Sequence, residues 1–173
     1  MRQFARAVDA ASRAGGYVAA LLLVYMVGHI LYEIVLRNLF ATSTFVLDEF
    51  VGYAVAGMIY LSLAYALRQG SMIRVSLVIG NLRGCARQVL EILCALLTLA
   101  LTLFLARYFL KEVWRDFERG TTSYSIAEVP VWIPEAVVLL GMVLFALQLV
   151  AYIARLLMGD PPVDRDPDTD ANG

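Results

Sequence analysis

Four long apolar segments constrain the fold of this chain more than any other feature. They run from about residue 15 to 36, 50 to 67, 87 to 107 and 131 to 154. A helix that crosses the hydrocarbon core of a membrane needs about 20 mostly apolar residues, and these segments are of that length. None of them alternates apolar and polar residues as the strands of a membrane barrel do. We therefore predict an all-α integral membrane protein with four transmembrane helices.

The composition favours the same class of protein. Hydrophobic residues make up 61% of the chain and charged residues 17%, whereas a soluble domain has about 45–50% and about 25%. The net charge of −1 offers no basic excess for nucleic acid, which we exclude as a partner. The first apolar segment is too long for a signal peptide, whose core has about 7–15 residues, so we expect a retained helix.

Lys and Arg in the short flanks predict the orientation. Arginines concentrate in the N-terminal segment and in the connection between the second and third spans, whereas the first connection has only Arg37. Because cytoplasmic flanks carry the excess of basic residues, we expect both termini in the cytoplasm. Lys111, Arg115 and Arg119, which would then lie outside, oppose this assignment.

Residues 1–157 are expected to form the four-helix membrane domain, and residues 158–173 a disordered, acidic cytoplasmic tail. Segment 72–84 has one apolar helical face, which is typical of a short helix in the membrane surface. The N-terminal residues 2–13 show a weaker pattern of the same kind. The third span is expected to continue one to three turns past Arg107.

That extension carries charges at helical spacing. Glu112 can reach Arg115, and Asp116 can reach Arg119, because residues three apart are neighbours on a helix.

The chain offers little for catalysis or cofactor binding. It has one histidine and two cysteines, Cys85 and Cys94, whose spacing matches neither a zinc site nor a CxxC redox motif. No metalloprotease, serine hydrolase or phosphate-binding motif occurs. We predict no catalytic residue, no cofactor, no metal site and no enzymatic activity.

A polar stripe runs along the first span, because Tyr25, His29, Glu33 and Arg37 recur every fourth residue. Ionisable groups inside a span are often functional, so one reading is a proton path. The reading we favour is structural: Glu33 pairs with Arg37 at i,i+4, and His29 bonds to a neighbouring helix. Gln148 in the fourth span is likewise expected to bond across helices.

Two further features concern the second span. Gly52 and Ala56 would give it a small-residue packing face. The acidic pair Asp48 and Glu49 stands directly before its uncharged stretch. There the pair would stabilise the helix start through the helix dipole or dock a partner protein, and the sequence leaves both roles open.

The stretch RNLFATSTFVLDEFVGYAVAGMIYLSLAYALRQGSMIRVSLV resembles the signature region of the DctQ family, the small membrane subunits of tripartite ATP-independent periplasmic (TRAP) transporters. The family positions are matched by Arg37, Asp48, Glu49, Arg68, Gly70, Ile73, Arg74 and Val75. The later VPVWIPEAVVLLG matches the family's entry into the fourth span through Pro130, Trp132, Pro134 and Gly141. The chain departs from the pattern at Phe45–Leu47, where a tryptophan is expected, and at Met72 and Ser76.

This resemblance implies a function and a set of partners. The chain would be a non-catalytic scaffold for a large TRAP membrane subunit in the bacterial inner membrane, surrounded by lipid. The large subunit would take up an organic anion by ion-driven symport, usually with sodium, after delivery by a periplasmic solute-binding protein. The candidate partner-interface residues are Arg37, Asp48, Glu49, Arg68, Arg74 and Trp132.

Two other functions stay open at this point. One is the membrane anchor subunit of a redox enzyme. The other is a small autonomous transporter or channel that uses His29 and Glu33.

Overall fold

The computed structural model describes residues 2–70 and 85–158, with side chains from residues 6 and 88 onward in these two ranges. This part of the chain forms four helices: α1 (Arg2–Phe40), α2 (Leu47–Arg68), α4 (Cys85–Arg119) and α5 (Trp132–Leu157). Each is long and apolar enough to cross a membrane. The predicted all-α fold with four spans is therefore confirmed. The expected surface helix at 72–84, which includes Arg74, and the tail at 159–173 lie outside the described residues.

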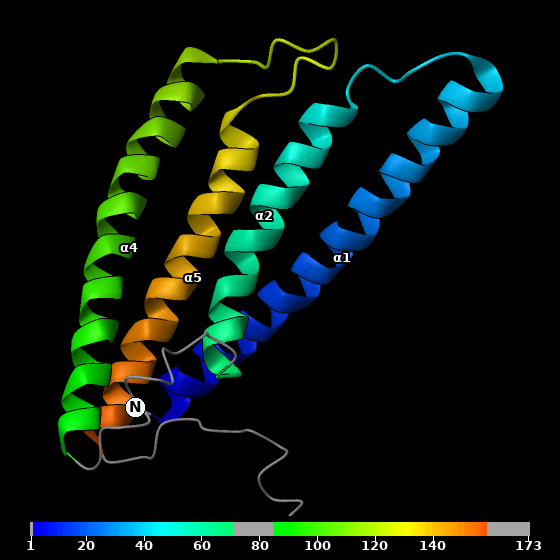
Figure 1. Ribbon diagram of the computed structural model, residues 1–173. Helices are drawn as coiled ribbons and strands as arrows, with labels where there is room; N and C mark the ends of the chain where they lie inside the picture. Colours follow the sequence, from blue (N-terminus) through cyan, green and yellow to red (C-terminus); the bar gives the residue numbers. More distant parts are fainter. Residues whose placement is uncertain (1, 71–84, 159–173) are drawn as a thin grey trace, which may run out of the picture.

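The helices stand in a row in the order α1, α2, α5, α4 (Figure 1). Each contacts its neighbour, and α1 also reaches α5. The α1–α2 and α4–α5 connections lie at one end of the row, at the top of Figure 1, which we call the loop end. The start of α1 and the end of α5 lie at the opposite end, which we call the terminal end.

The two outer helices are much longer than a bilayer core requires. At 1.5 Å per residue, α1 is about 58 Å long and α4 about 52 Å, against a hydrocarbon core of about 30 Å. The N-terminal segment, expected as a separate surface helix, is instead the first part of α1, and its Val8 and Ser12 are buried against the other helices. The expected extension of α4 is present, since the helix continues to Arg119, about three turns past Arg107.

The charges on this extension are arranged partly as predicted. Arg115 pairs with Glu112. Asp116, which was expected to reach Arg119, is instead 8% exposed and lies 3.6 Å from the Arg115 Nε. It also accepts a hydrogen bond of 3.3 Å from the Thr121 hydroxyl. The reason is that the chain turns at residue 120, which brings the connection back over Asp116.

The middle of the row is held by close packing between α2 and α5. Ala64 and Leu67 of α2 pack on Phe145 and Leu149 of α5 in one buried cluster. Closer to the loop end, Gly141 lets the two helices approach, because a Cβ on it would lie 2.6 Å from the Tyr60 carbonyl carbon. Of the small-residue face predicted at Gly52 and Ala56, only Ala56 packs within this chain, against a buried cluster that includes Val138 and Met142 of α5. Gly52 is exposed, and a Cβ added to it would meet nothing within 4 Å.

The Gly141→Ala substitution is expected to destabilise the protein, because the new methyl group meets the backbone of α2 and not a movable side chain. Overpacking of this kind costs about 1–3 kcal/mol. Thermal unfolding of the purified protein in mild detergent measures the change. The matched control is Gly28→Ala on an open face of α1, which should be neutral or slightly stabilising because alanine favours helices. Equal melting temperatures for the two variants would contradict the packing argument.

Candidate functional site

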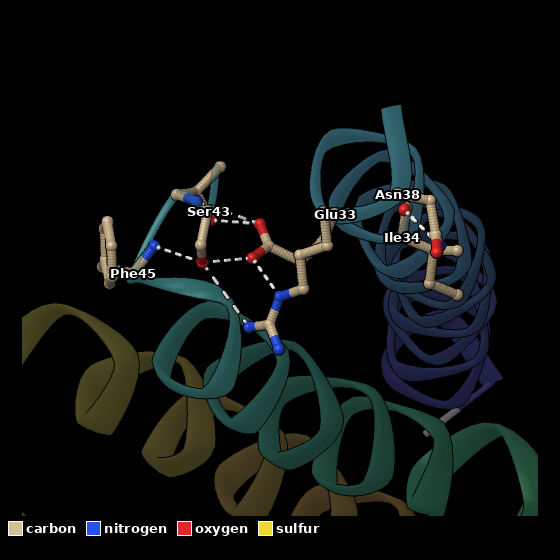
Figure 2. Close-up of polar contacts among 7 residues, drawn as sticks. Glu33, Ile34, Asn38, Ser43 and Phe45 are labelled. Atoms are coloured by element: carbon tan, nitrogen blue, oxygen red, sulfur yellow. Dashed lines mark hydrogen bonds and ion pairs between the residues drawn. The ribbon is translucent and has the colours of Figure 1, made fainter. Parts of the chain in front are cut away.

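The Glu33 carboxylate ties α1 to the connection that follows it. Its side chain is only 1% exposed. Oε1 accepts hydrogen bonds from the Arg37 Nε at 2.9 Å and from the Ser43 hydroxyl, which it faces in Figure 2. Oε2 accepts from the Thr44 backbone N–H at 3.1 Å and from the Thr44 hydroxyl at 2.7 Å. The expected Glu33–Arg37 ion pair is therefore present, and it belongs to a larger cluster of four residues that we call the Glu33 clamp.

The clamp fixes a turn that the backbone would not adopt freely. Ala41 and Phe45, which flank the clamped residues, have φ angles of 49° and 59°. Such left-handed conformations cost about 1–3 kcal/mol each in non-glycine residues. Between them, the Ser43 Oγ accepts a hydrogen bond of 3.1 Å from the Phe45 backbone N–H. The bonds to Glu33 and Ser43 thus offset the strain and set how the chain enters α2.

The two acidic residues at the start of α2 have different surroundings. Both lie in the first turn of the helix, where the dipole favours negative charge. Glu49 is partly buried, accepts a hydrogen bond of 2.7 Å from the Tyr53 hydroxyl and lies near Ser123 and Ser125 of the α4–α5 connection. Asp48 is exposed and forms no hydrogen bond to a residue of the described ranges. Asp48 is therefore the member of the pair that stays free for an outside ligand.

The predicted polar stripe does not form a continuous path. The Tyr25 and His29 rings lie 5.6 Å apart, and His29 meets Phe50 of α2 edge-on at 6.2 Å. The buried Nδ1 of His29 has no hydrogen-bond partner among the described residues. The expected hydrogen bond from His29 to a neighbouring helix is not found among the described residues, where the ring of His29 contacts that of Phe50 instead. Glu33, one turn further on, is occupied by its clamp.

A second polar cluster, which we call the Asp9 cluster, joins three helices at the terminal end. Asp9 of α1 accepts a hydrogen bond of 2.8 Å from Arg155 of α5 and lies 3.6 Å from Arg68 Nε of α2. Gln148 donates to Asp9 at 3.2 Å and accepts from the Ser12 hydroxyl at 3.1 Å. The expected bonding of Gln148 across helices is confirmed.

Sequence reasoning missed the role of Asp9. The available signal was its i,i+3 spacing from Ser12, which places both on one face of a helix. An amphipathic pattern alone does not show whether such a polar face meets lipid headgroups or other helices.

Of the six residues expected at a partner interface, the structure describes all except Arg74, and it distributes these five over both ends of the molecule. Arg37 and Asp48 line one cavity of about 570 Å³ at the loop end. Trp132, at the start of α5, is half-buried and meets Phe117 edge-on at 5.4 Å. Arg68 lies at the terminal end in the Asp9 cluster. Over the described ranges, no group of three metal-binding side chains gathers.

The Glu33→Gln substitution is expected to lower the melting temperature by about 5 °C. The amide keeps the shape of the side chain but removes the negative charge that its four hydrogen-bond donors, the Arg37 guanidinium among them, interact with. Thermal unfolding in mild detergent measures the effect. Glu118→Gln is the control, since that exposed carboxylate accepts one hydrogen bond, from Trp114. A melting temperature for Glu33→Gln as high as that of the control would show that the clamp does not stabilise the fold.

The Asp9→Ala substitution is expected to cost about 1–2 kcal/mol, because interhelical hydrogen bonds in membrane proteins average about 0.6 kcal/mol and Asp9 also holds two guanidinium groups. Unfolding by a denaturing detergent, followed by circular dichroism, measures the loss. Arg13→Ala, which removes an exposed charge one turn away, should leave stability nearly unchanged. If both substitutions act alike, the Asp9 cluster does not bind the three helices together.

Comparison with known proteins identifies the family. The sequence profile described as "Tripartite ATP-independent periplasmic transporters, DctQ component" matches residues 26–159. No curated protein and no solved structure matched the chain. The matched range contains the Glu33 clamp, the acidic pair and the whole of α2, α4 and α5, with the connection between α2 and α4. The chain therefore belongs to the DctQ family of TRAP transporter components and is a multi-pass membrane protein.

Proposed function

We propose that this chain is the non-catalytic small membrane subunit of a TRAP-type secondary transporter in the bacterial inner membrane. In this role it braces a large permease subunit that takes up an organic anion by symport, driven by an ion gradient. A periplasmic solute-binding protein delivers the anion. Membership of the DctQ family supports the assembly.

One structural observation supports a bracing role over transport by the chain alone. The ionisable groups at the two ends are occupied by contacts within the chain: the buried Glu33 holds the α1–α2 connection, and the partly buried Asp9 cluster joins three helices. A transporter usually needs broken helices and free polar groups near the middle of the bilayer. The described helices run unbroken through that region, so their polar groups are suited to rigidity.

The outer helices offer the faces on which a larger subunit could pack. In the most apolar stretches of α1 and α4, 11% of the residues are buried within the chain, whereas 44% are buried in the corresponding stretch of α5. The exposed side chains there are mostly large and apolar, as in Leu21, Leu31, Leu97 and Phe104. The large permease subunit and lipid would share these faces.

We further propose that the loop end faces the periplasm. The arginines of the N-terminal segment and of the connection after α2 would then lie in the cytoplasm, as the charge rule requires. In this orientation Asp48, Glu49 and Trp132 lie on the side from which a binding protein would approach. Both chain termini lie on the other side.

Reconstitution tests the proposed function. We expect uptake in vesicles only when this chain, the large permease subunit that copurifies with it and the binding protein are combined under an ion gradient. The chain alone should give neither uptake nor proton flux. His29→Ala in the full complex should keep the uptake rate within about twofold of wild type, because a structural ring contact affects transport only through stability.

Two outcomes would replace the proposal. Flux through the chain alone that His29→Ala abolishes would identify an autonomous transporter or channel. Copurification with a coloured redox enzyme in place of a large permease would identify an anchor subunit.

A further inference from the structure

We propose that the cavity at the loop end binds the headgroup of a phospholipid with a primary amine, of the phosphatidylethanolamine type. The cavity, of about 570 Å³, is open and lies between the end of α1 and the start of α2. Ligand sites commonly have volumes of about 300–1,000 Å³, so a headgroup fits. The lining combines Arg37 and Asp48 with the hydroxyl residues Thr42 and Ser43.

Two opposite charges face this cavity without pairing to each other. Arg37 and Asp48 form no ion pair in the structure as described. The Arg37 guanidinium has five N–H donors. It uses Nε for Glu33 and one Nη2 hydrogen for Ser43 at 3.5 Å, and its side chain remains 61% exposed. The cavity therefore offers spare donors that suit a phosphate and a free carboxylate that suits an ammonium group.

The apolar surroundings favour a lipid over a free phosphate compound. Leu39 and Phe40, at the end of α1, are 74% and 67% exposed, and Phe45 in the cavity lining is 73% exposed. Exposure of such side chains to water is unfavourable, whereas contact with lipid acyl chains removes them from water. An arginine among such side chains can extend its guanidinium toward the headgroup phosphates while its stem lies along apolar surface.

Charge balance selects the type of headgroup. Glu33 already neutralises Arg37, so Asp48 gives the cavity an excess of negative charge. A headgroup with net negative charge is disfavoured there, whereas a zwitterionic headgroup can place its phosphate at Arg37 and its amine at Asp48. A choline group lacks N–H donors and cannot make the charge-assisted hydrogen bond that an ethanolamine group makes to a carboxylate.

Native mass spectrometry of the purified full chain in mild detergent tests the proposal. The probes are phosphatidylethanolamine, phosphatidylcholine and phosphatidylglycerol with the same acyl chains, and glycerophosphoethanolamine as the soluble headgroup. We expect the ethanolamine lipid to bind about threefold to tenfold more tightly than the other two lipids. Asp48→Asn should remove this preference, whereas Glu128→Gln, an exposed acid on the other connection, should preserve it.

The variants separate the two halves of the headgroup. Arg37→Gln should weaken the binding of all three lipids. Arg119→Gln, which removes an exposed arginine outside the cavity, should leave the binding of all three unchanged. If Arg37→Gln fails to fold because it disrupts the Glu33 clamp, the lipid preference of Asp48→Asn still tests the proposal. Equal affinity for the three lipids in the wild type, or an unchanged preference in Asp48→Asn, would overturn the proposal. If glycerophosphoethanolamine binds as tightly as the lipid, the proposal that the occupant is a lipid is contradicted. The cavity would then be a site for a soluble phosphoethanolamine compound.

Discussion

A buried carboxylate at the edge of a membrane is tolerated only when the protein supplies partners for both of its oxygens, and the arrangement of the loop end depends on this constraint. Glu33 meets it with Arg37 from its own helix and with Ser43 and Thr44 from the connection. Because three of its four donors lie on the connection, satisfying the carboxylate also folds the turn. The direction in which α2 leaves the turn, and with it the positions of Asp48 and Glu49, follows from a single side chain of α1.

The same logic operates at the terminal end with different groups. Asp9 is shared by guanidinium groups of α2 and α5, and Gln148 links it to Ser12. Between these two polar clusters the helices are joined by apolar contacts and by the close approach at Gly141. Lipid gives little hydrophobic drive for helices to associate, so close packing and interhelical hydrogen bonds have to hold them. In this chain, close packing joins the helices in the middle, and polar contacts join them at both ends.

The sequence predicted the number of spans, the Glu33–Arg37 pair and the extension of α4, because these depend on local patterns of hydropathy and charge. It did not predict that the N-terminal segment joins α1, since its amphipathic pattern is the same whether the polar face meets headgroups or other helices. The Asp9 cluster was missed for a second reason: its members are up to 146 positions apart, so no local pattern connects them. Nor could sequence separate Asp48 from Glu49, whose surroundings differ only once the α4–α5 connection lies beside Glu49.

The charges of the two polar clusters bear on the orientation of the chain. The Asp9 cluster sets two arginines against one aspartate, so it carries an excess of positive charge. At the loop end, Arg37 stands against Glu33, Asp48 and Glu49, so the excess there is negative. Lys and Arg are favoured on the cytoplasmic side. The two arginines of the Asp9 cluster therefore agree with the proposed periplasmic loop end, whereas Lys111, Arg115 and Arg119 on the extension of α4 oppose it. Glu112 and Asp116 accompany Arg115 there, so part of that positive charge is neutralised within the chain. In the proposed orientation, Arg68 and Arg155 would thus serve twice, as arginines on the cytoplasmic side and as the side chains that join α2 and α5 to Asp9 of α1.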